Sequence, residues 1–417
     1  MDRSILCAVR GAATLAACPR ALGTLVLSAL LACGGGAPAR DASRATSADS
    51  VKDIVIGMPW PWEMAKQTRY KDGVALALEE VNAGGGIGGH RLRLMQVDDR
   101  GSVDSGRVVA QRLTQDHSVV AIVGHLQSFV TMPAAAIYDL AGIPLVAPFA
   151  TDPQLTSLGY KNVFRTTFTD IEAGQQLADY AAKRGYKRAA IYYIRTAYGR
   201  ILANAFEERA TERGITTVAR QSYDGGSSTV EQSVDGTLRA WKNLQFDVVF
   251  LAGEPEQAAS FIASARRRGI QAAVIGGDAL GVTPFLTMAG HELDGTVVAS
   301  VFHPDSPRAA TRTFAAKFKA RFGTVPDPAA AQGYDAVRLL AEAIRRAGSA
   351  SPDKVATALH GLRAWSGATG DVTFDQHGDI VGSVVTKMIV RDGHFEYLPD
   401  DATVADLANA PRRPRAN

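Results

Sequence analysis

From residue 53 onward, short runs of β-branched residues alternate with longer amphipathic segments, and this alternation restricts the possible folds more than any other feature of the chain. The strand-like runs are Ile54 to Ile56, Leu92 to Val97, Val119 to Val123 and Pro144 to Ala147, and the helix-like segments between them are Glu63 to Val81, Val103 to Gln115 and Phe129 to Leu140. This order predicts βαβ units, in which parallel strands form a sheet covered by helices on both faces.

A second series of the same kind follows along the chain. Its strand-like runs are Ala189 to Ile194, Thr216 to Tyr223, Val248 to Leu251 and Ala273 to Ile275, and its helix-like segments are Tyr198 to Arg213, Val230 to Leu244 and Pro255 to Arg268. Because a single hydrophobic core stops growing at about 250 to 300 residues, the two series should form separate lobes. The sequence therefore predicts an α/β protein with two doubly wound parallel-sheet lobes and a ligand cleft between them.

The segment between the two series and the C-terminal part complete this prediction. Val163 to Phe168 is strand-like, and the next helix should begin after Asp170, because aspartate favours helix N-caps. Three further helices and two further strands are expected at Pro307 to Phe322, Pro328 to Gly348, Pro352 to Leu362, Asp371 to Phe374 and Val384 to Val390.

The N-terminal segment has the pattern of an export signal. Arg3, Arg10 and Arg20 precede an apolar run, Ala21 to Leu31, which is too short to span a bilayer because a spanning helix needs about 20 residues. Cys33 follows at once, and this arrangement resembles a bacterial lipoprotein signal. We predict a signal peptide at residues 1–32 and a lipidated Cys33; an ordinary signal peptide cut nearby is the alternative.

Charge and cysteine content restrict the function classes. The 45 Lys+Arg and 42 Asp+Glu residues give a formal charge of +3, too small for the basic footprint of a nucleic-acid binder. Cleavage before Cys33 would remove Cys7 and Cys18, so the exported chain could form no internal disulfide. Residues 33–52 read as a flexible tether and residues 401–417 as a disordered tail, which leaves the lipid anchor as the expected contact with the membrane.

Gly84 to Gly89 satisfies the letters of the dinucleotide-binding fingerprint G-x-G-x-x-G. That fingerprint must follow a strand and open a helix, so that the helix N-terminus meets the pyrophosphate. Here the glycines follow a predicted helix and precede a predicted strand. They are therefore interpreted as a helix C-cap and turn, and no dinucleotide cofactor is expected.

Other patterns for catalysis or metal binding are weak. The sequence contains no H-E-x-x-H and no G-x-S-x-G motif. Asp98 and Asp99 follow a strand-like run, where an acidic pair is more often a solvated loop or a cap than a metal site. His125 is interpreted as a hydrogen-bonding loop residue rather than a base. We predict a protein that is not an enzyme and has no resident metal or cofactor.

In open parallel sheets, ligands bind beyond the carboxyl ends of the strands. The residues that follow the predicted strands and that we expect at the ligand are Trp60, Trp62, Ser128, Phe129, Phe149, Ala150 and Thr151 in the first lobe, and Tyr198, Glu254 and Asp278 in the second. The first group offers hydroxyls and a helix N-terminus suited to an anion. The second offers two carboxylates and a phenol suited to an ammonium group. Together they could hold a small zwitterion.

Some of these residues have simpler interpretations. Ser128 and Thr151 could be helix N-caps, and Glu254 could be an acid in the first turn of a helix. Asp278 follows two glycines, and nothing local requires an acid there. Trp60 and Trp62 flank a proline and are poor candidates for the core, so we expect them in a cleft wall.

An ordered set of fragments then resembles one known family. The fragments are Glu79 to Gly89 followed by Val97-Asp98-Asp99, Val123-Gly124, Ile143-Pro144-Leu145, Ala150 to Thr156, Phe164-Arg165-Thr166, Tyr198-Gly199, Gly333 to Ala336 and Gly370 to Asp375. Between about Ile54 and Leu398 the chain is similar to type I periplasmic binding proteins of the leucine/isoleucine/valine-binding branch.

The resemblance implies two lobes joined by three crossings of the chain. Lobe 1 would comprise residues 53–169 and 300–350, and lobe 2 would comprise residues 170–299 and 351–400. It also implies that Ser128 and Thr151 contact the carboxylate and ammonium of the ligand, with help from backbone groups near Phe149. Tyr198 and Asp278 would complete the site, Asp278 matching the acid that holds an α-ammonium group.

Several residues depart from the family pattern. Phe129 stands where relatives often carry a second small hydroxyl residue, Phe149 replaces a small residue, and Glu254 replaces an aromatic. Trp60 and Trp62 stand in a loop that usually has a different composition. These departures favour a bulkier or differently polar ligand than leucine.

The main hypothesis is an exported, lipid-anchored solute-binding protein that captures an amino acid or related small polar ligand by lobe closure and presents it to the permease of an ABC importer. The alternative is a sensor that binds an amide or a small organic acid and signals to a regulatory partner.

Overall fold

The computed structural model describes residues 53–225 and 230–400. The predictions for the signal peptide, Cys33, the tether and the tail at 401–417 concern residues outside these ranges. The described chain forms two α/β lobes, each built on its own sheet. The predicted fold class is therefore confirmed.

The first lobe is built on a five-stranded parallel sheet with the order β2-β1-β3-β4-β5. Its elements are β1 (Asp53–Trp60), α2 (Tyr70–Ala83), β2 (Arg91–Asp98), α3 (Val103–Gln115), β3 (Val119–Val123), α4 (Ser128–Leu140), β4 (Leu145–Ala147), α5 (Gln154–Ser157) and β5 (Val163–Arg165). α3 and α4 pack on one face of the sheet, while α2 and later helices pack on the other. The buried β-branched residues of β3 illustrate why a strand covered on both faces is almost wholly apolar.

The second lobe has a seven-stranded sheet with the order β14-β13-β10-β9-β8-β6-β7, in which β13 and β14 run antiparallel to their neighbours. Its elements are α6 (Asp170–Lys183), β6 (Arg188–Ile194), α7 (Ala197–Glu212), β7 (Thr216–Tyr223), α8 (Val230–Trp241), β8 (Val248–Ala252), α9 (Pro255–Arg267), β9 (Ala273–Gly276), η1 (Asp278–Leu280), α10 (Thr283–Met288), η2 (Gly290–Leu293), β10 (Val297–Ser300), β13 (Thr386–Arg391) and β14 (His394–Leu398). α6 and α7 cover one face of the sheet, and α8 and α9 cover the other.

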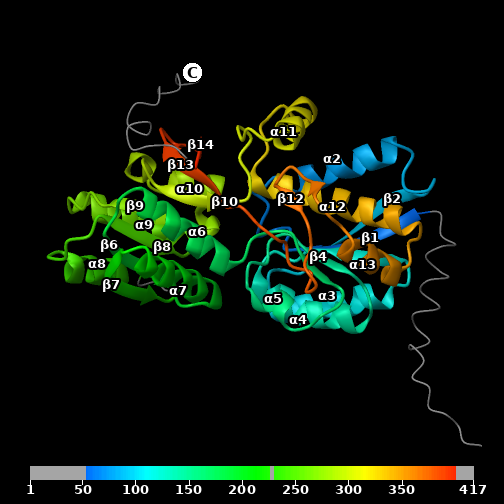
Figure 1. The fold of residues 1–417 in the computed structure, drawn as a ribbon, viewed down its shortest axis with the longest axis horizontal. Helices are drawn as coiled ribbons and strands as arrows, with labels where there is room; N and C mark the ends of the chain where they lie inside the picture. The colour runs from blue at the N-terminus through cyan, green and yellow to red at the C-terminus, as the bar shows by residue number, and fades with distance from the viewer. Residues whose placement is uncertain (1–52, 226–229, 401–417) are drawn as a thin grey trace, which may run out of the picture. The chain divides into compact units, whose positions relative to one another are not determined.

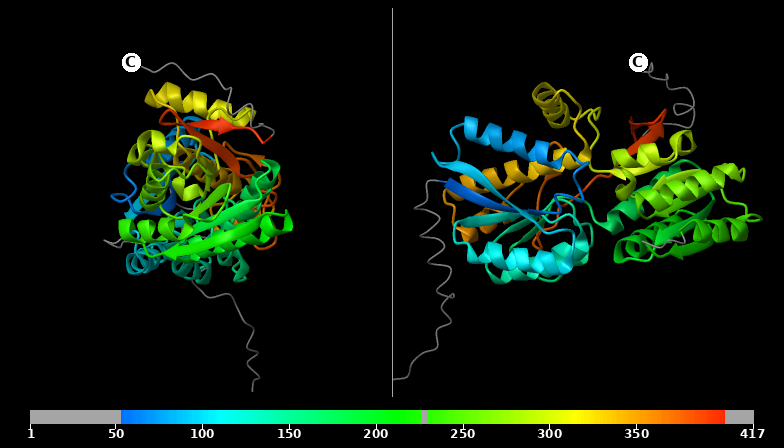
Figure 2. Two further views of the ribbon diagram at one scale, coloured as in Figure 1. Left: turned by 90° about the vertical axis from the view of Figure 1, so that its left-hand side faces the viewer. Right: turned by 180° about the vertical axis from the view of Figure 1, so that it is seen from behind.

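The chain passes three times between the sheets, and the connecting segments can be followed by colour in Figures 1 and 2. After β10 it returns to the first lobe as α11 (Ala309–Phe322), α12 (Pro328–Ala347), α13 (Pro352–His360), β11 (Trp365–Ser366) and β12 (Asp371–Val372). The apolar residues of α13 and β12 lie in the same core as α2 and α12. This differs from the expectation that residues 351–400 join the second lobe. The short loop after α12 folds α13 back onto its neighbour, so the third crossing comes about thirty residues later, near Ile380.

Two helix starts differ from their predictions. α6 begins at Asp170 itself, because the hydroxyl of Thr169 accepts the backbone N–H of Glu172 and the Glu172 carboxylate accepts the N–H of Thr169, a complete capping box. α2 begins at Tyr70 instead of Glu63, since residues 62–68 form turns. The interpretation of the glycine run is confirmed: α2 ends at Ala83, Gly84 follows as its C-cap, and four of the next five residues are glycines with positive φ.

α2 and α12 pack closely because Gly73 of α2 has no side chain where it meets the backbone of Ala330 in α12. A Cβ atom built on Gly73 would lie 1.9 Å from the backbone oxygen of Ala330, well inside van der Waals contact. Tyr334 of α12 packs nearby in the same core, and its hydroxyl donates a 2.8 Å hydrogen bond to Glu80 of α2. The paired helices therefore cover one face of the first sheet as a unit.

The first and third crossings are tied together by a buried ion pair. Arg165, which is 0% exposed, donates from Nε and Nη2 to the two carboxylate oxygens of Asp379 at 2.9 and 2.6 Å. Further on, the N–H of Val381 donates to the Thr373 carbonyl of the first lobe. The Gln176 side chain of α6 bonds the Ser383 carbonyl and the Val385 N–H. The third crossing is therefore held by both lobes, on either side of a single residue, Gly382.

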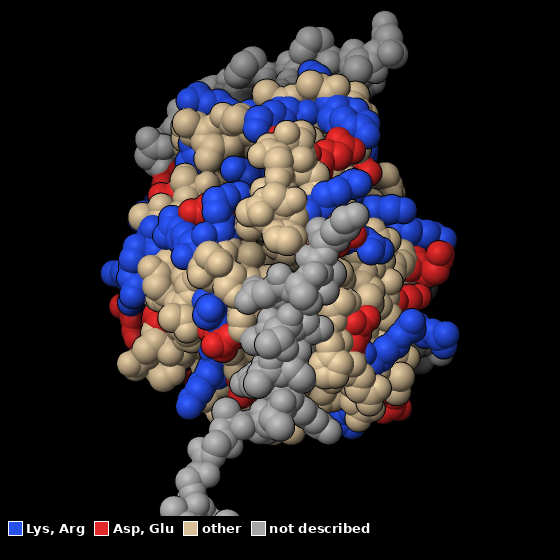
Figure 3. All heavy atoms as spheres, turned by 90° about the vertical axis from the view of Figure 1, so that its right-hand side faces the viewer, with Lys and Arg blue, Asp and Glu red and all other residues tan. Residues whose placement is uncertain are grey.

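Lysine and arginine side chains are interspersed with acidic ones on the face shown in Figure 3. Among residues 53–225 and 230–400, we find no helix with the length and apolar character that crossing a bilayer requires.

Candidate functional site

Tyr198 and Asp278 meet at the carboxyl ends of β6 and β9. Tyr198 lies in the first turn of α7, and its hydroxyl donates a 3.0 Å hydrogen bond to Oδ1 of Asp278. The same hydroxyl oxygen accepts the backbone N–H of Ala279 at 3.3 Å. Two helix starts are thus joined at the sheet edge where ligands of open parallel sheets bind.

This pair is electrostatically perturbed. Burial raises the pKa of Asp278, and the hydrogen bond from Tyr198 opposes that rise. Burial also raises the pKa of Tyr198 well above its usual value, and the negative charges of Asp278 and Asp170 raise it further. Tyr198 therefore stays a protonated phenol that orients the Asp278 carboxylate, and a carboxylate held in this way is chemically suited to accept a hydrogen bond from a cationic donor.

Glu254 lies beside this pair at the N-cap of α9, where its side chain makes no capping hydrogen bond. Its backbone N–H donates to the hydroxyl of Tyr223, at the end of β7, at 3.1 Å. The side chain is accessible to solvent, yet partial desolvation, and secondly the charge of Asp278, raise its pKa. The simpler interpretation of Glu254 as a stabilising acid fits its place at the helix start, and the charge of Asp278 also acts on its carboxylate.

Asp170 is an acid of this region that the sequence did not single out as a site residue. It is 1% exposed, and neither carboxylate oxygen has a hydrogen-bond partner of standard geometry. Burial raises the pKa of Asp170 well above its usual value, Asp278 adds to the rise, and the nearby Thr151 side chain opposes it. The sequence contains a signal that could have marked Asp170 as a site residue. Thr169 and Glu172 have the spacing of a capping box, so Asp170 is not needed as the helix N-cap.

Ser128 and Thr151 approach each other in the first lobe. The Ser128 hydroxyl accepts the backbone N–H of Asp152 at 3.3 Å, and the carbonyl of Thr151 accepts the backbone N–H of Asp170 at 2.9 Å. The N-cap of α4 is Gln127 and that of α5 is Pro153, so neither hydroxyl residue is a helix cap. This leaves both hydroxyls near the point where the chain enters the second lobe.

Four aromatic side chains gather behind these hydroxyls. Trp60 stacks on Tyr70 with ring centroids 3.9 Å apart, Phe149 lies 4.7 Å from Trp60, and Trp62 lies 6.2 Å from Tyr70. Trp60 is 1% exposed and belongs to the core, so the expectation that it is unsuited to the core is wrong. β1 continues to Trp60 and carries its ring into the apolar interior.

For three further predicted residues, the structure shows a location but, within the part of the chain that it describes, no side-chain contact with Ser128, Thr151, Tyr198 or Asp278. Phe129 is exposed on the first turn of α4. Ala150 is buried, and its carbonyl accepts a hydrogen bond from Arg165. Trp62 is half-buried, and its indole N–H donates to the Val97 carbonyl. Their contact with a ligand stays a prediction.

The interpretation of His125 as a hydrogen-bonding loop residue is confirmed. Its Nδ1 lies 2.6 Å from Oδ2 of Asp99 and its Nε2 lies 3.2 Å from the Tyr138 hydroxyl, with all three side chains buried. Asp98 is exposed and caps a turn, as expected of a loop acid, but Asp99 is fully buried. The acidic pair is therefore not a metal site: Asp99 uses its carboxylate on His125 and on the N–H of Gly101.

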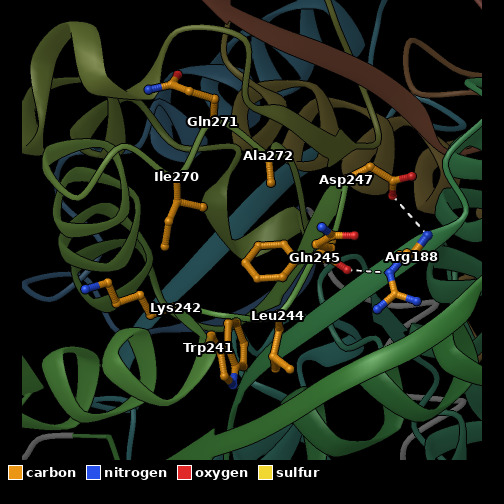
Figure 4. A pocket seen from close by; sticks show the side chains of 10 residues that line it. Arg188, Trp241, Lys242, Leu244, Gln245, Asp247, Ile270, Gln271 and Ala272 are labelled. Carbon is orange, nitrogen blue, oxygen red and sulfur yellow. Dashed lines mark hydrogen bonds between the residues drawn. The ribbon is translucent and has the colours of Figure 1, made fainter.

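Two further features lie elsewhere. A surface pocket is lined by residues at the amino ends of β6, β8 and β9, including Arg188, Asp247 and Ala272, and so lies at the other end of the strands from Asp278 (Figure 4). Within the described ranges, His291, Asp294 and Asp392 could place three ligand atoms near a metal ion, but His291 and Asp392 are exposed. Neither feature involves a predicted site residue.

The chain matches known binding proteins over most of its length. Residues 63–390 match the family model described as periplasmic binding protein. A Leu/Ile/Val-binding protein homolog 1 of Brucella suis is 28% identical over 382 residues, covering 90% of this chain and 97% of that protein. A leucine-, isoleucine-, valine-, threonine-, and alanine-binding protein of Pseudomonas aeruginosa is 29% identical, covering 81% of this chain and 89% of that protein.

A solved structure agrees with these matches. An ABC transporter substrate-binding protein from Desulfitobacterium hafniense, crystallised in complex with Leu, is 36% identical and superimposes with a TM-score of 0.75, covering 83% of this chain and all of that one. The family match, the two-lobed fold and the polar groups at the strand ends agree with one another. This chain belongs to the periplasmic binding protein family.

Proposed function

We propose that this protein is the extracytoplasmic solute-binding subunit of an ABC importer, and that it captures an amino acid or related small polar ligand by lobe closure. The permease of that importer is the proposed partner. Capture requires no chemical reaction: the lobes bind the ligand in common, and ligand binding favours the closed state.

The observation that carries this proposal is the Tyr198–Asp278 pair. The Tyr198 hydroxyl holds Oδ1 of the buried Asp278 carboxylate and orients it, and an oriented carboxylate can accept a charge-assisted hydrogen bond from a ligand ammonium. Ser128 and Thr151 supply hydroxyls for the ligand carboxylate. The names of the relatives from Pseudomonas aeruginosa and Desulfitobacterium hafniense, which bind α-amino acids, support the same ligand class.

The test is a thermal-shift screen of the full chain against α-amino acids, amides and carboxylic acids, followed by calorimetric titration of the hits. A ligand that binds only the folded state must raise the melting temperature. We expect hits among α-amino acids, and a loss of affinity of about tenfold to a hundredfold in Asp278→Asn, because one charge-assisted hydrogen bond is removed.

The matched control is Glu208→Gln, which neutralises an exposed acid on the same helix as Tyr198. It should leave the affinity unchanged. Hits confined to amides or to acids without an ammonium group would contradict the amino-acid ligand and favour the sensor alternative.

We also propose that the chain is anchored outside the cytoplasm by lipidated Cys33. Membership in the periplasmic binding protein family supports export, and the segment before Cys33 has the charge and apolar pattern of a signal peptide.

A further inference from the structure

Three carboxylates surround one phenol in the second lobe. Tyr198 donates to Asp278 at 3.0 Å, and Glu254 and Asp278 follow the neighbouring parallel strands β8 and β9. The charges of Asp278, Asp170 and Glu254 all raise the pKa of Tyr198. None of the three acids forms an ion pair with any residue of the ranges 53–225 and 230–400. The positive charge that lowers the pKa of Asp170 is that of Arg165, whose guanidinium is already bonded to Asp379. Among the described residues, the site therefore holds three acids and no basic side chain paired with them.

Asp170 is the most unusual member of this group. Both of its oxygens are buried without a hydrogen bond of standard geometry, the Thr151 side chain is the one hydrogen-bonding group that lowers its pKa, and the helix that it begins is already capped by Thr169. A buried carboxylate with so little hydrogen bonding is costly, so such a group usually has a role that the protein alone does not display. Its coupling to Asp278 places that negative charge beside the ligand-binding acid.

A neutral α-amino acid does not match this excess of acids. Its single ammonium group would be taken by Asp278, and its own carboxylate would add a further negative charge. Glu254, the one of the three acids that is open to solvent, would then face an uncharged side chain. The unfavourable charge balance would remain in the closed site, where water can no longer screen it.

We propose that the ligand carries a second positive charge: it is an α-amino acid whose side chain ends in an ammonium or guanidinium group, with Asp278 holding the α-ammonium, Glu254 holding the distal cation and Asp170 acting as a buried positioning charge behind both. This proposal rests on the proposed function, since it assigns the ligand class of the same site. Asp170 favours cations through the field of its charge and has no direct ligand contact.

Binding should also release protons. The pKa values of Glu254 and Asp170 are raised in the ligand-free protein, and a bound cation lowers them again because it stabilises the ionised forms. The groups that face them are Asp278 of η1, Tyr198 of α7, Thr151 and Asp152 before α5, and Arg165 of β5. Calorimetric titration in buffers of different ionisation enthalpy measures the number of protons released.

The test compares ligands of matched shape and different charge on the full chain. L-arginine is paired with L-citrulline, and L-lysine with L-norleucine. We expect each charged member to bind about tenfold or more tightly than its neutral partner, which is the ratio that one charge-assisted hydrogen bond supplies. The charged member should also release more protons.

The variants locate the effect. Glu254→Gln should reduce the charged-to-neutral ratio to near one while citrulline binds as before, and Glu256→Gln, at an exposed acid two residues further along α9, should leave the ratio unchanged. Asp170→Asn should reduce both the ratio and the proton release. If Asp170→Asn fails to fold, the affinity ratios of Glu254→Gln and its control Glu256→Gln still test the dicationic ligand.

The outcomes separate the two proposals. Tighter binding of citrulline and norleucine than of their charged partners, or an unchanged ratio in Glu254→Gln, overturns the dicationic ligand but leaves amino-acid binding in place. If none of the four ligands binds and no other amino acid does, the proposed function itself fails.

Discussion

Asp170 shows what one buried side chain can contribute to the pH dependence of the whole protein. Its pKa is raised above the ordinary value of 3.8, so the folded chain holds this proton more tightly than the unfolded chain. The unfolded state then binds fewer protons over the interval between the two pKa values. The contribution of Asp170 to the free energy of unfolding is therefore greatest below about pH 4 and decreases as the pH rises through that interval.

The first prediction follows from this decrease of the Asp170 contribution with rising pH. In the ligand-free protein, the free energy of unfolding of wild type relative to Asp170→Asn should be larger at about pH 4.5 than at about pH 7.5, because only the wild type loses a proton at this site. Urea denaturation at the two pH values measures it. Asp104→Asn, an exposed first-turn acid of α3, is the matched variant. Equal differences at both pH values would contradict the assignment.

At the residue scale, the sequence predicts the polar site better than its surroundings. Tyr198, Asp278 and Glu254 could be found because each directly follows a strand of a parallel sheet, where position along the chain fixes position at the sheet edge. Trp60 was misplaced because the sequence does not show how far β1 extends. Asp170 was taken for a cap, since only the structure shows that Thr169 performs that task.

At the scale of elements, the contact between α2 and α12 depends on the absence of one methyl group. Gly73→Ala should lower the free energy of unfolding by about 1–3 kcal/mol, because its Cβ would overlap the Ala330 backbone and the helices would have to separate. Gly236→Ala is the control: it lies inside α8 with no atom near the new Cβ, so it should stabilise by about 0.5–1 kcal/mol. Urea denaturation distinguishes the two, and a neutral Gly73→Ala would contradict the packing argument.

Most elements of the two sheets follow from periodicity. The predicted bounds of α3, β3 and β7 are those observed. β10 was missed because four residues are too few to show a pattern, and the lobe of α13 was wrong because an amphipathic helix shows which face is apolar but not which core receives it. Element type is thus a local property of the sequence, whereas the partner of an element is not.

At the scale of the molecule, the Arg165–Asp379 pair joins segments 214 residues apart. Asp379→Ala should destabilise the protein by about 3–5 kcal/mol, because it leaves a guanidinium buried without its counter-charge. Glu79→Ala breaks the exposed two-bond pair with Arg321 and should cost about 1 kcal/mol or less. Urea denaturation measures the free energy of unfolding of both variants. Similar decreases would show that the Arg165–Asp379 ion pair adds little to stability.

The proposed anchor is a property of the whole chain in its cell. Cys33→Ala should shift the protein from the membrane fraction to the soluble fraction, because an acyl chain attached to that thiol is the proposed attachment. Cys18→Ala changes a cysteine inside the predicted signal and should leave the protein membrane-bound. Fractionation followed by immunoblotting reads out both, and membrane attachment of Cys33→Ala would reject lipidation at this residue.

Gly382 has a consequence for the speed of ligand capture. Val381 is hydrogen-bonded to the first lobe and Ser383 to the second. Rotation of the third crossing between the lobes is therefore concentrated in the φ and ψ angles of Gly382. That residue has a φ of +71°, and a Cβ built on it would meet no other atom within 4 Å. A side chain at this position would meet no other residue, but it would be strained at this φ and would restrict rotation about the link. We therefore expect the rate of lobe closure to depend in part on a glycine outside the proposed binding site.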